Sequence, residues 1–110
     1  RILGDDHLDV AESLFCLSIV NAKTDEFQKA IELMEESLRV RKLQLGDSHQ
    51  LVADTKHNMG VVYFYQNNFE EALKWYKNAL QMKEASEDDK IQLSIAETLH
   101  CIGEVQTEMG

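Results

Sequence analysis

Leu45-Gly46-Asp47-Ser48-His49 lies near the middle of the chain and repeats Leu3-Gly4-Asp5-Asp6-His7 with an offset of 42 residues. The same offset relates downstream apolar and small residues: Val10 to Val52, Ala11 to Ala53, Phe27 to Phe69, Ala30 to Ala72 and Leu38 to Leu80. A third copy begins near Glu87, because Ile95-Ala96-Glu97 matches Val52-Ala53-Asp54 with an offset of 43 residues. Self-similarity at a fixed period indicates a repeat architecture. The sequence therefore predicts a single domain, 1–110, in which repeat one is 3–44, repeat two is 45–86, and the first helix of repeat three is 87–110.

Each repeat has the hydrophobic pattern of two helices. In the first, apolar residues recur every three or four positions at Val10, Leu14, Leu17 and Val20, and again from Phe27 onward. That spacing is typical of one buried helical stripe. The pattern predicts an all-α protein of about five antiparallel helices at 7–22, 26–44, 48–66, 69–85 and 88–109.

Polar residues at the breaks between these segments predict helix ends. Asp25 with Gln28, and Asn68 with Glu71, have the spacing of a side-chain cap at the start of a helix. Gly46 is expected to end one helix and Asp47 to cap the next. His7 and His49 share a repeat position, which indicates a role in the turn before a first helix.

The composition excludes several classes of function. The chain of 110 residues contains no proline, 11 basic residues and 20 acidic residues, for a net charge of −9. This balance argues against nucleic-acid binding and against docking on anionic membranes, since both depend on Lys and Arg. The longest uncharged apolar stretch is too short to cross a bilayer, which takes about 20 residues. Two cysteines form no disulfide framework and favour a reducing, cytoplasmic location.

The second repeat carries the motif residues of a known family. Lys56, Met59-Gly60 and Tyr63 on the first helix are followed by Ala72, Tyr76 and Ala79 on the second, and this pattern resembles the tetratricopeptide repeat (TPR). Small residues such as Gly60, Ala72 and Ala79 fit where two helices cross closely. The 42-residue period and the Leu-Gly-Asp-x-His sequence resemble the longer repeats of kinesin light chains. Those repeats usually carry Pro after the His, where Leu8 and Gln50 stand in this chain.

The resemblance implies a right-handed α-α superhelix, with the first helices lining a concave groove and the second helices forming the back. It also implies a protein–protein interaction module that binds a peptide or a partner helix in this groove. The expected partner-binding residues are Phe15, Ile19, His57, Asn58, Val61, Phe64, Tyr65, His100 and Glu104. An apolar centre and an acidic edge favour a ligand with an apolar anchor and basic flanks. The alternative is that Phe15, Ile19 and Phe64 only pack within the superhelix.

The sequence also bears on catalytic, metal-binding and structural functions. The chain has no phosphate-binding loop, nucleophile elbow or metalloprotease motif, so we expect no enzyme and no cofactor. His57, His100, Cys101, Cys16 and Glu104 match no metal-ligand spacing, so we expect no metal site. The rival interpretation is a structural spacer or self-assembly segment, which joins further repeats or a second copy through its open C-terminal end. A third is a sensor array that regulates an attached domain.

Overall fold

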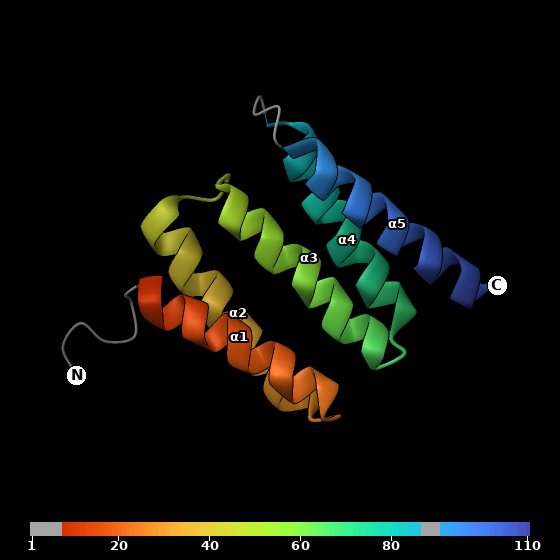
Figure 1. Ribbon diagram of the computed structural model, residues 1–110, viewed down its shortest axis with the longest axis horizontal. Coiled ribbons are helices and arrows are strands. Elements are labelled where there is room, and N and C mark those ends of the chain that lie inside the picture. Colours follow the sequence, from red (N-terminus) through yellow and green to blue (C-terminus); the bar gives the residue numbers. More distant parts are fainter. Residues whose placement is uncertain (1–7, 87–90) are drawn as a thin grey trace.

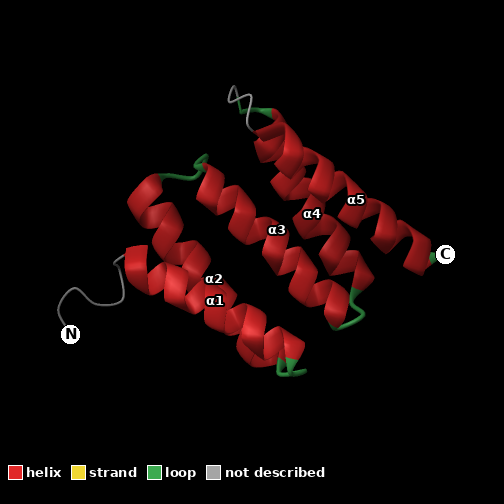
Figure 2. Cartoon of the chain, viewed as in Figure 1, coloured by secondary structure: helices red, strands yellow, loops and turns green. Residues whose placement is uncertain are grey.

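In a computed structural model of the protein, residues 8–86 and 91–110 are described. They form the helices α1 (Leu8–Lys23), α2 (Phe27–Leu45), α3 (Gln50–Tyr65), α4 (Phe69–Glu84) and α5 (Gln92–Met109). No strand occurs within these two ranges, so the predicted all-α class is confirmed (Figure 2). The predicted helix starts at residues 7 and 88, and the Leu3-Gly4-Asp5 copy of the repeat signature with His7, lie outside the described residues.

The helices pack as successive hairpins. α1 pairs most extensively with α2, and α3 with α4, while α2 and α4 also pack on the first helix of the following repeat. α3 therefore lies between α2 and α4 in the middle of the array (Figure 1). Buried residues form one apolar cluster that joins α1, α2 and α3, and a second between α4 and α5, against which partly buried residues of α3 pack. Among the described helices, none combines the length and the apolar character that a membrane span needs.

Small residues allow close crossings inside each hairpin. The Ser18 hydroxyl of α1 donates to the Ala30 carbonyl of α2 at 2.7 Å, and the Ser37 hydroxyl of α2 donates to the Ala11 carbonyl of α1 at 2.7 Å. In the second hairpin, a Cβ added to Gly60 would lie 2.7 Å from Cδ1 of the Tyr76 ring. The interpretation of Gly60 as a close-crossing residue is therefore confirmed.

The turns inside the two hairpins share one backbone conformation. Asp25 and Asn67, 42 residues apart, have φ values of 66° and 65°, in the left-handed region that Asp and Asn tolerate better than most residues. The capping prediction was wrong for Asp25, whereas Asn68 is confirmed as the N-cap of its helix but lacks the predicted side-chain hydrogen bond. The N-cap of α2 is Glu26 and that of α4 is Asn68, and neither makes a side-chain cap hydrogen bond. Asp25 stands one residue too early, because the turn uses it as its left-handed residue.

The loop between the repeats departs from prediction at one residue. Gly46 ends α2 with φ 92°, and its N–H donates to the Lys42 carbonyl at 2.9 Å, which confirms it as the C-cap. The prediction that Asp47 caps the next helix was wrong. The N-cap of α3 is His49, whose Nδ1 accepts the Leu51 N–H at 3.0 Å. This contact confirms that His49 acts in the turn before a first helix.

The predicted buried stripe of the first helix was partly wrong. Leu17 and Val20 of α1 are 48% and 56% exposed, while α1 buries Ala11, Ser18, Asn21 and Ala22. Val10 and Leu14, the other two residues of the stripe, are half-buried. In α5, likewise, Ile102 and Val105 are buried but Leu99 is 50% exposed. One apolar side of each outer helix therefore has no covering helix among the described residues.

Candidate functional site

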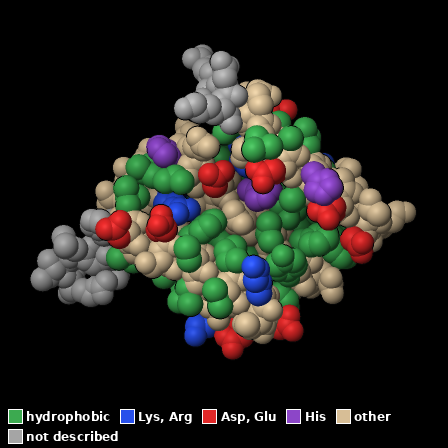
Figure 3. All heavy atoms as spheres, in the orientation of Figure 1, with side chains coloured by type: hydrophobic (Ala, Val, Ile, Leu, Met, Phe, Trp, Pro, Cys, Tyr) green, Lys and Arg blue, Asp and Glu red, His purple; other side chains and the backbone are tan. Residues whose placement is uncertain are grey.

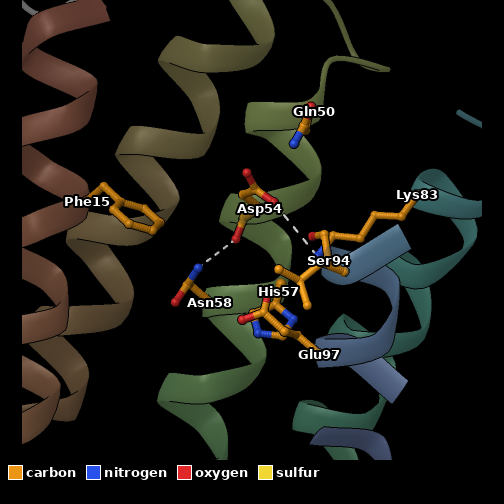
Figure 4. Close-up of a pocket in the computed structure, with 9 residues that line it drawn as sticks. Phe15, Gln50, Asp54, His57, Asn58, Lys83, Ser94 and Glu97 are labelled. Atoms are coloured by element: carbon orange, nitrogen blue, oxygen red, sulfur yellow. Dashed lines mark hydrogen bonds and ion pairs between the residues drawn. The ribbon is translucent and has the colours of Figure 1, made fainter. Parts of the chain in front are cut away.

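A cavity of about 470 Å³ opens between the first helices of the repeats. Phe15 of α1 and Leu93, Ser94 and Glu97 of α5 form opposite walls. Gln50, Asp54, His57 and Asn58 of α3 lie between them, and Lys83 of α4 reaches the cavity from behind (Figure 4). In the space-filling view, apolar side chains gather near the middle of the α1–α3–α5 face, with acidic, histidine and a few Lys or Arg side chains among and around them (Figure 3). We call this face the groove.

Lys83 is the most buried charged residue of the cavity. It belongs to α4, yet its side chain extends to α5 and is only 2% exposed. Its Nζ donates to Thr98 Oγ1 at 2.9 Å and lies 3.8 Å from Asp54 Oδ1. Burial lowers the pKa of Lys83, and the charges of Asp54 and Glu97 oppose that shift. Burial likewise raises the pKa of Asp54, and Lys83 opposes it. The pair is therefore held in place by a hydroxyl and by mutual attraction.

His57 shares the same hydroxyl. Its Nδ1 lies 2.9 Å from Thr98 Oγ1, and its ring centroid lies 5.2 Å from that of Tyr76. Burial, together with the charge of Lys83, lowers the pKa of His57 to about 4. The imidazole is therefore neutral at neutral pH. Cys101 Sγ lies 3.9 Å from His57 Nε2, but burial raises the pKa of this thiol, which opposes formation of a reactive thiolate.

One repeat earlier, Arg41 makes the equivalent contacts. It is 42 residues before Lys83, is 5% exposed, and donates from Nη1 to Thr55 Oγ1 at 2.8 Å. Its guanidinium stacks 4.7 Å above the Phe15 ring, and Phe15 is 42 residues before His57. The planar guanidinium of Arg41 can stack on the aromatic ring of Phe15. Lys83 has a compact ammonium group instead, and the residue equivalent to Phe15 in its repeat is the polar His57.

Sequence reasoning missed Arg41 and Lys83 as groove residues, because both stand on second helices, which were assigned to the back of the array. A signal was available in the repeat itself. The two basic residues occupy the same repeat position, and Thr55 and Thr98, 43 residues apart, occupy a matching position on the following first helices. Every buried side-chain N and O atom in 8–86 and 91–110 has a hydrogen-bond partner. These four residues provide the partners at the bottom of the groove.

The structure brings some of the predicted partner-binding residues together and separates others. Phe15, His57 and Asn58 line the cavity, and Asn58 donates from Nδ2 to the Asp54 carbonyl at 2.9 Å. Tyr65 is 46% exposed and lines a separate depression with Lys23.

The remaining predicted residues lie beside the cavity or beyond it. Ile19 is half-buried against the first apolar cluster, and Val61 and Phe64 against the second. Both His100 and Glu104 are exposed on α5, with Nε2 and Oε1 3.7 Å apart. Among the described residues, no three His, Cys, Asp or Glu side chains are grouped so that they could hold a metal ion.

Comparison with known proteins gives one positive result. A family model described as tetratricopeptide repeat matches residues 9–85, which include α1 to α4. No curated protein sequence matches the chain.

Proposed function

The chain belongs to the tetratricopeptide repeat family, and we propose on this premise that it binds a segment of a partner protein in the groove, without catalysis. Repeats of this family generally mediate protein–protein interactions. The observation that supports the groove as the binding surface is the cavity between α1, α3 and α5, which combines the apolar ring of Phe15 with polar and charged groups of α3 and α5. Concave sites with an apolar wall and a few placed polar groups are typical binding sites.

The residues of the groove suggest how a partner would be held. Phe15 and Ile19 are half-buried and offer an apolar anchor. Asn58 lines the cavity and carries an amide that can pair with the backbone of an extended peptide. Glu97 and Glu104 of α5 are exposed and favour basic flanks in the ligand. We therefore propose a ligand with an apolar anchor and basic flanks.

Selection from a random peptide library displayed on phage tests this function. We expect the chain to enrich a defined set of peptides, and the Asn58→Ala/Tyr65→Ala variant to lose at least tenfold in affinity for them. The matched control is Lys77→Ala/Gln81→Ala, which changes two exposed residues on α4 and should bind as the unaltered chain does. Equal binding by both variants would place the interaction outside the groove.

A second candidate function, a spacer or self-assembly segment, rests on the outer helices. Leu17 and Val20 on α1, and Leu93 and Leu99 on α5, are all at least 48% exposed. Such apolar faces fit further helices or a second copy. Sedimentation velocity separates the two proposals. Self-assembly that Leu99→Gln reverses, together with failure of the library selection, would favour the spacer.

A further inference from the structure

Charged side chains of alternating sign cross the groove from α1 to α5. The acidic members are Glu12, Asp54 and Glu97, which stand 42 and 43 residues apart on the three first helices. The basic members are Arg41 and Lys83, which stand 42 residues apart on the two second helices. We call these five residues the charge ladder.

Each basic residue of the ladder interacts with acidic residues of two successive repeats. Burial lowers the pKa of Arg41, and the charges of Glu12 and Asp54 oppose that shift. Lys83 lies 3.8 Å from Asp54, and the charge of Glu97 also acts on it. The order across the groove is therefore acid, base, acid, base, acid, and the ladder ends in an acid on both α1 and α5.

The two signs differ in their exposure to solvent. Arg41 and Lys83 are 5% and 3% exposed, and donors of both are engaged by the Thr55 and Thr98 hydroxyls. The Asp54 side chain is 34% exposed, and Glu12 and Glu97 are exposed. The positive charges thus lie beneath the surface of the groove and the negative charges lie at it. A ligand that enters the groove meets carboxylates first.

The residues around the carboxylates add to this difference between exposed negative and buried positive charges. Lys83 is the only basic residue that lines the cavity among the described residues, and His57 is neutral at neutral pH because burial lowers its pKa. The apolar side chains of Phe15 and Leu93 form part of the wall, and low-dielectric walls focus the field of charges placed between them. At the cavity, a ligand therefore meets the carboxylates of the ladder before the two cations that lie beneath them.

We propose that the partner segment is extended and carries Lys or Arg side chains four residues apart, which pair with successive carboxylates of the charge ladder. This rests on the groove being the binding surface. The first helices contact one another less closely than they contact the second helices, so their axes lie farther apart than the about 8–10 Å of directly packed helices. In an extended chain, side chains alternate between two faces, and those four residues apart lie on the same face at a separation of about 13 Å. Side chains at this spacing reach the acidic residues of neighbouring first helices, Glu12 and Asp54 on α1 and α3, and then Glu97 on α5.

Capped Gly/Ser peptides of ten residues provide the test. One carries Arg at positions 2, 6 and 10, a second carries Glu there, and a third carries three consecutive Arg residues. We expect the spaced Arg peptide to shift the amide NMR signals near Glu12, Asp54 and Glu97 at the lowest concentration, and the Glu peptide to shift none of them. Equal affinity for the spaced Arg and Glu peptides would overturn the proposal, as would stronger binding of the consecutive Arg peptide.

Two charge-neutralising variants decide whether the charge ladder itself binds the spaced Arg peptide. Glu97→Gln and Glu84→Gln each remove one exposed carboxylate, but Glu84 belongs to α4, a second helix at the back of the array. We expect Glu97→Gln to weaken the spaced Arg peptide about two- to fivefold and Glu84→Gln to change little. Equal effects would show that only net charge matters and would contradict the proposal. A groove that selects library peptides without basic residues would also overturn it, together with the proposed basic flanks, but would leave intact the proposal that the groove binds a segment of a partner protein.

Discussion

The helices α1 and α3 hold the same position in successive repeats, but they bury different faces. Met59 and Val62 of α3 are fully buried, whereas Leu17 and Val20, 42 residues earlier on α1, are 48% and 56% exposed. α3 packs against α2 on one side and α4 on the other, while α1 has α2 as its main neighbour. The contribution of a repeat position to stability therefore depends on whether a second neighbouring helix is present.

Truncation of these apolar residues is expected to give the largest difference in the free energy of unfolding between α3 and α1. Met59→Ala should lower the free energy of unfolding by about 2–5 kcal/mol, because it opens a cavity in the cluster around Met34 and Ala30. Leu17→Ala should lower it by less than about 1 kcal/mol, since half of that side chain is already in water. Urea denaturation followed by circular dichroism measures both. Similar losses would mean that the outer face of α1 is covered in solution.

Gly60 on α3 and Gly103 on α5 allow the same comparison between an inner helix and the outer helix at the other end of the array. A Cβ at Gly60 would lie 2.7 Å from the buried Tyr76 ring, whereas a Cβ at Gly103 would meet no atom within 4 Å. Gly60→Ala should therefore destabilise the protein by about 1–3 kcal/mol. Gly103→Ala should stabilise it by up to about 1 kcal/mol, through the better helix propensity of Ala. Thermal unfolding distinguishes the two variants, and a destabilised Gly103→Ala would reveal a neighbour that packs on this side of α5.

The third comparison changes stability only in acid and concerns two histidines 43 residues apart, His57 on α3 and His100 on α5. Burial and Lys83 lower the folded-state pKa of His57 from 6.5 to about 4. Between these pH values the unfolded state binds more protons at this site, so acidification destabilises the fold. His57→Asn should therefore reduce the loss of stability between pH 6.5 and pH 4.

The matched variant for that experiment is His100→Asn, which changes a side chain that is 76% exposed. In urea denaturation at several pH values, the free energy of unfolding of this variant should depend on pH as that of the unaltered chain does. If His57→Asn and the unaltered chain lose stability in parallel below pH 6.5, His57 is not buried in neutral form.

Much of the fold was predictable from the spacing of residues. The 42-residue offset and the helical periodicity located α1 to α5, and Gly46 marked the end of α2 because a residue with positive φ was needed there. The details of the turns were less predictable. Asp25 and His49 are both residue types that cap helices or form turns, and only the backbone conformation shows that Asp25 takes the left-handed position while His49 caps α3.

The candidate site was predictable only in part. Phe15, His57 and Asn58 were expected in the groove from their place on first helices, and all three line the cavity. Arg41 and Lys83 were not expected there, because their side chains extend past their own helices to Thr55 and Thr98. Periodicity predicts which face of a helix a residue occupies, but it does not predict how far a long side chain reaches between neighbouring helices.

The sequence by itself determined the repeat, the helices and the register that relates their residues, since these depend on local periodicity and on small residues such as Gly60 that permit close crossings. Only the tertiary structure decided which copies of a repeated residue are buried. Met59 and Leu17 differ because α3 has helices on both sides. Tertiary structure also buried Arg41 and Lys83 beneath the more exposed carboxylates of the charge ladder, because charges on neighbouring helices approach one another only when those helices pack side by side.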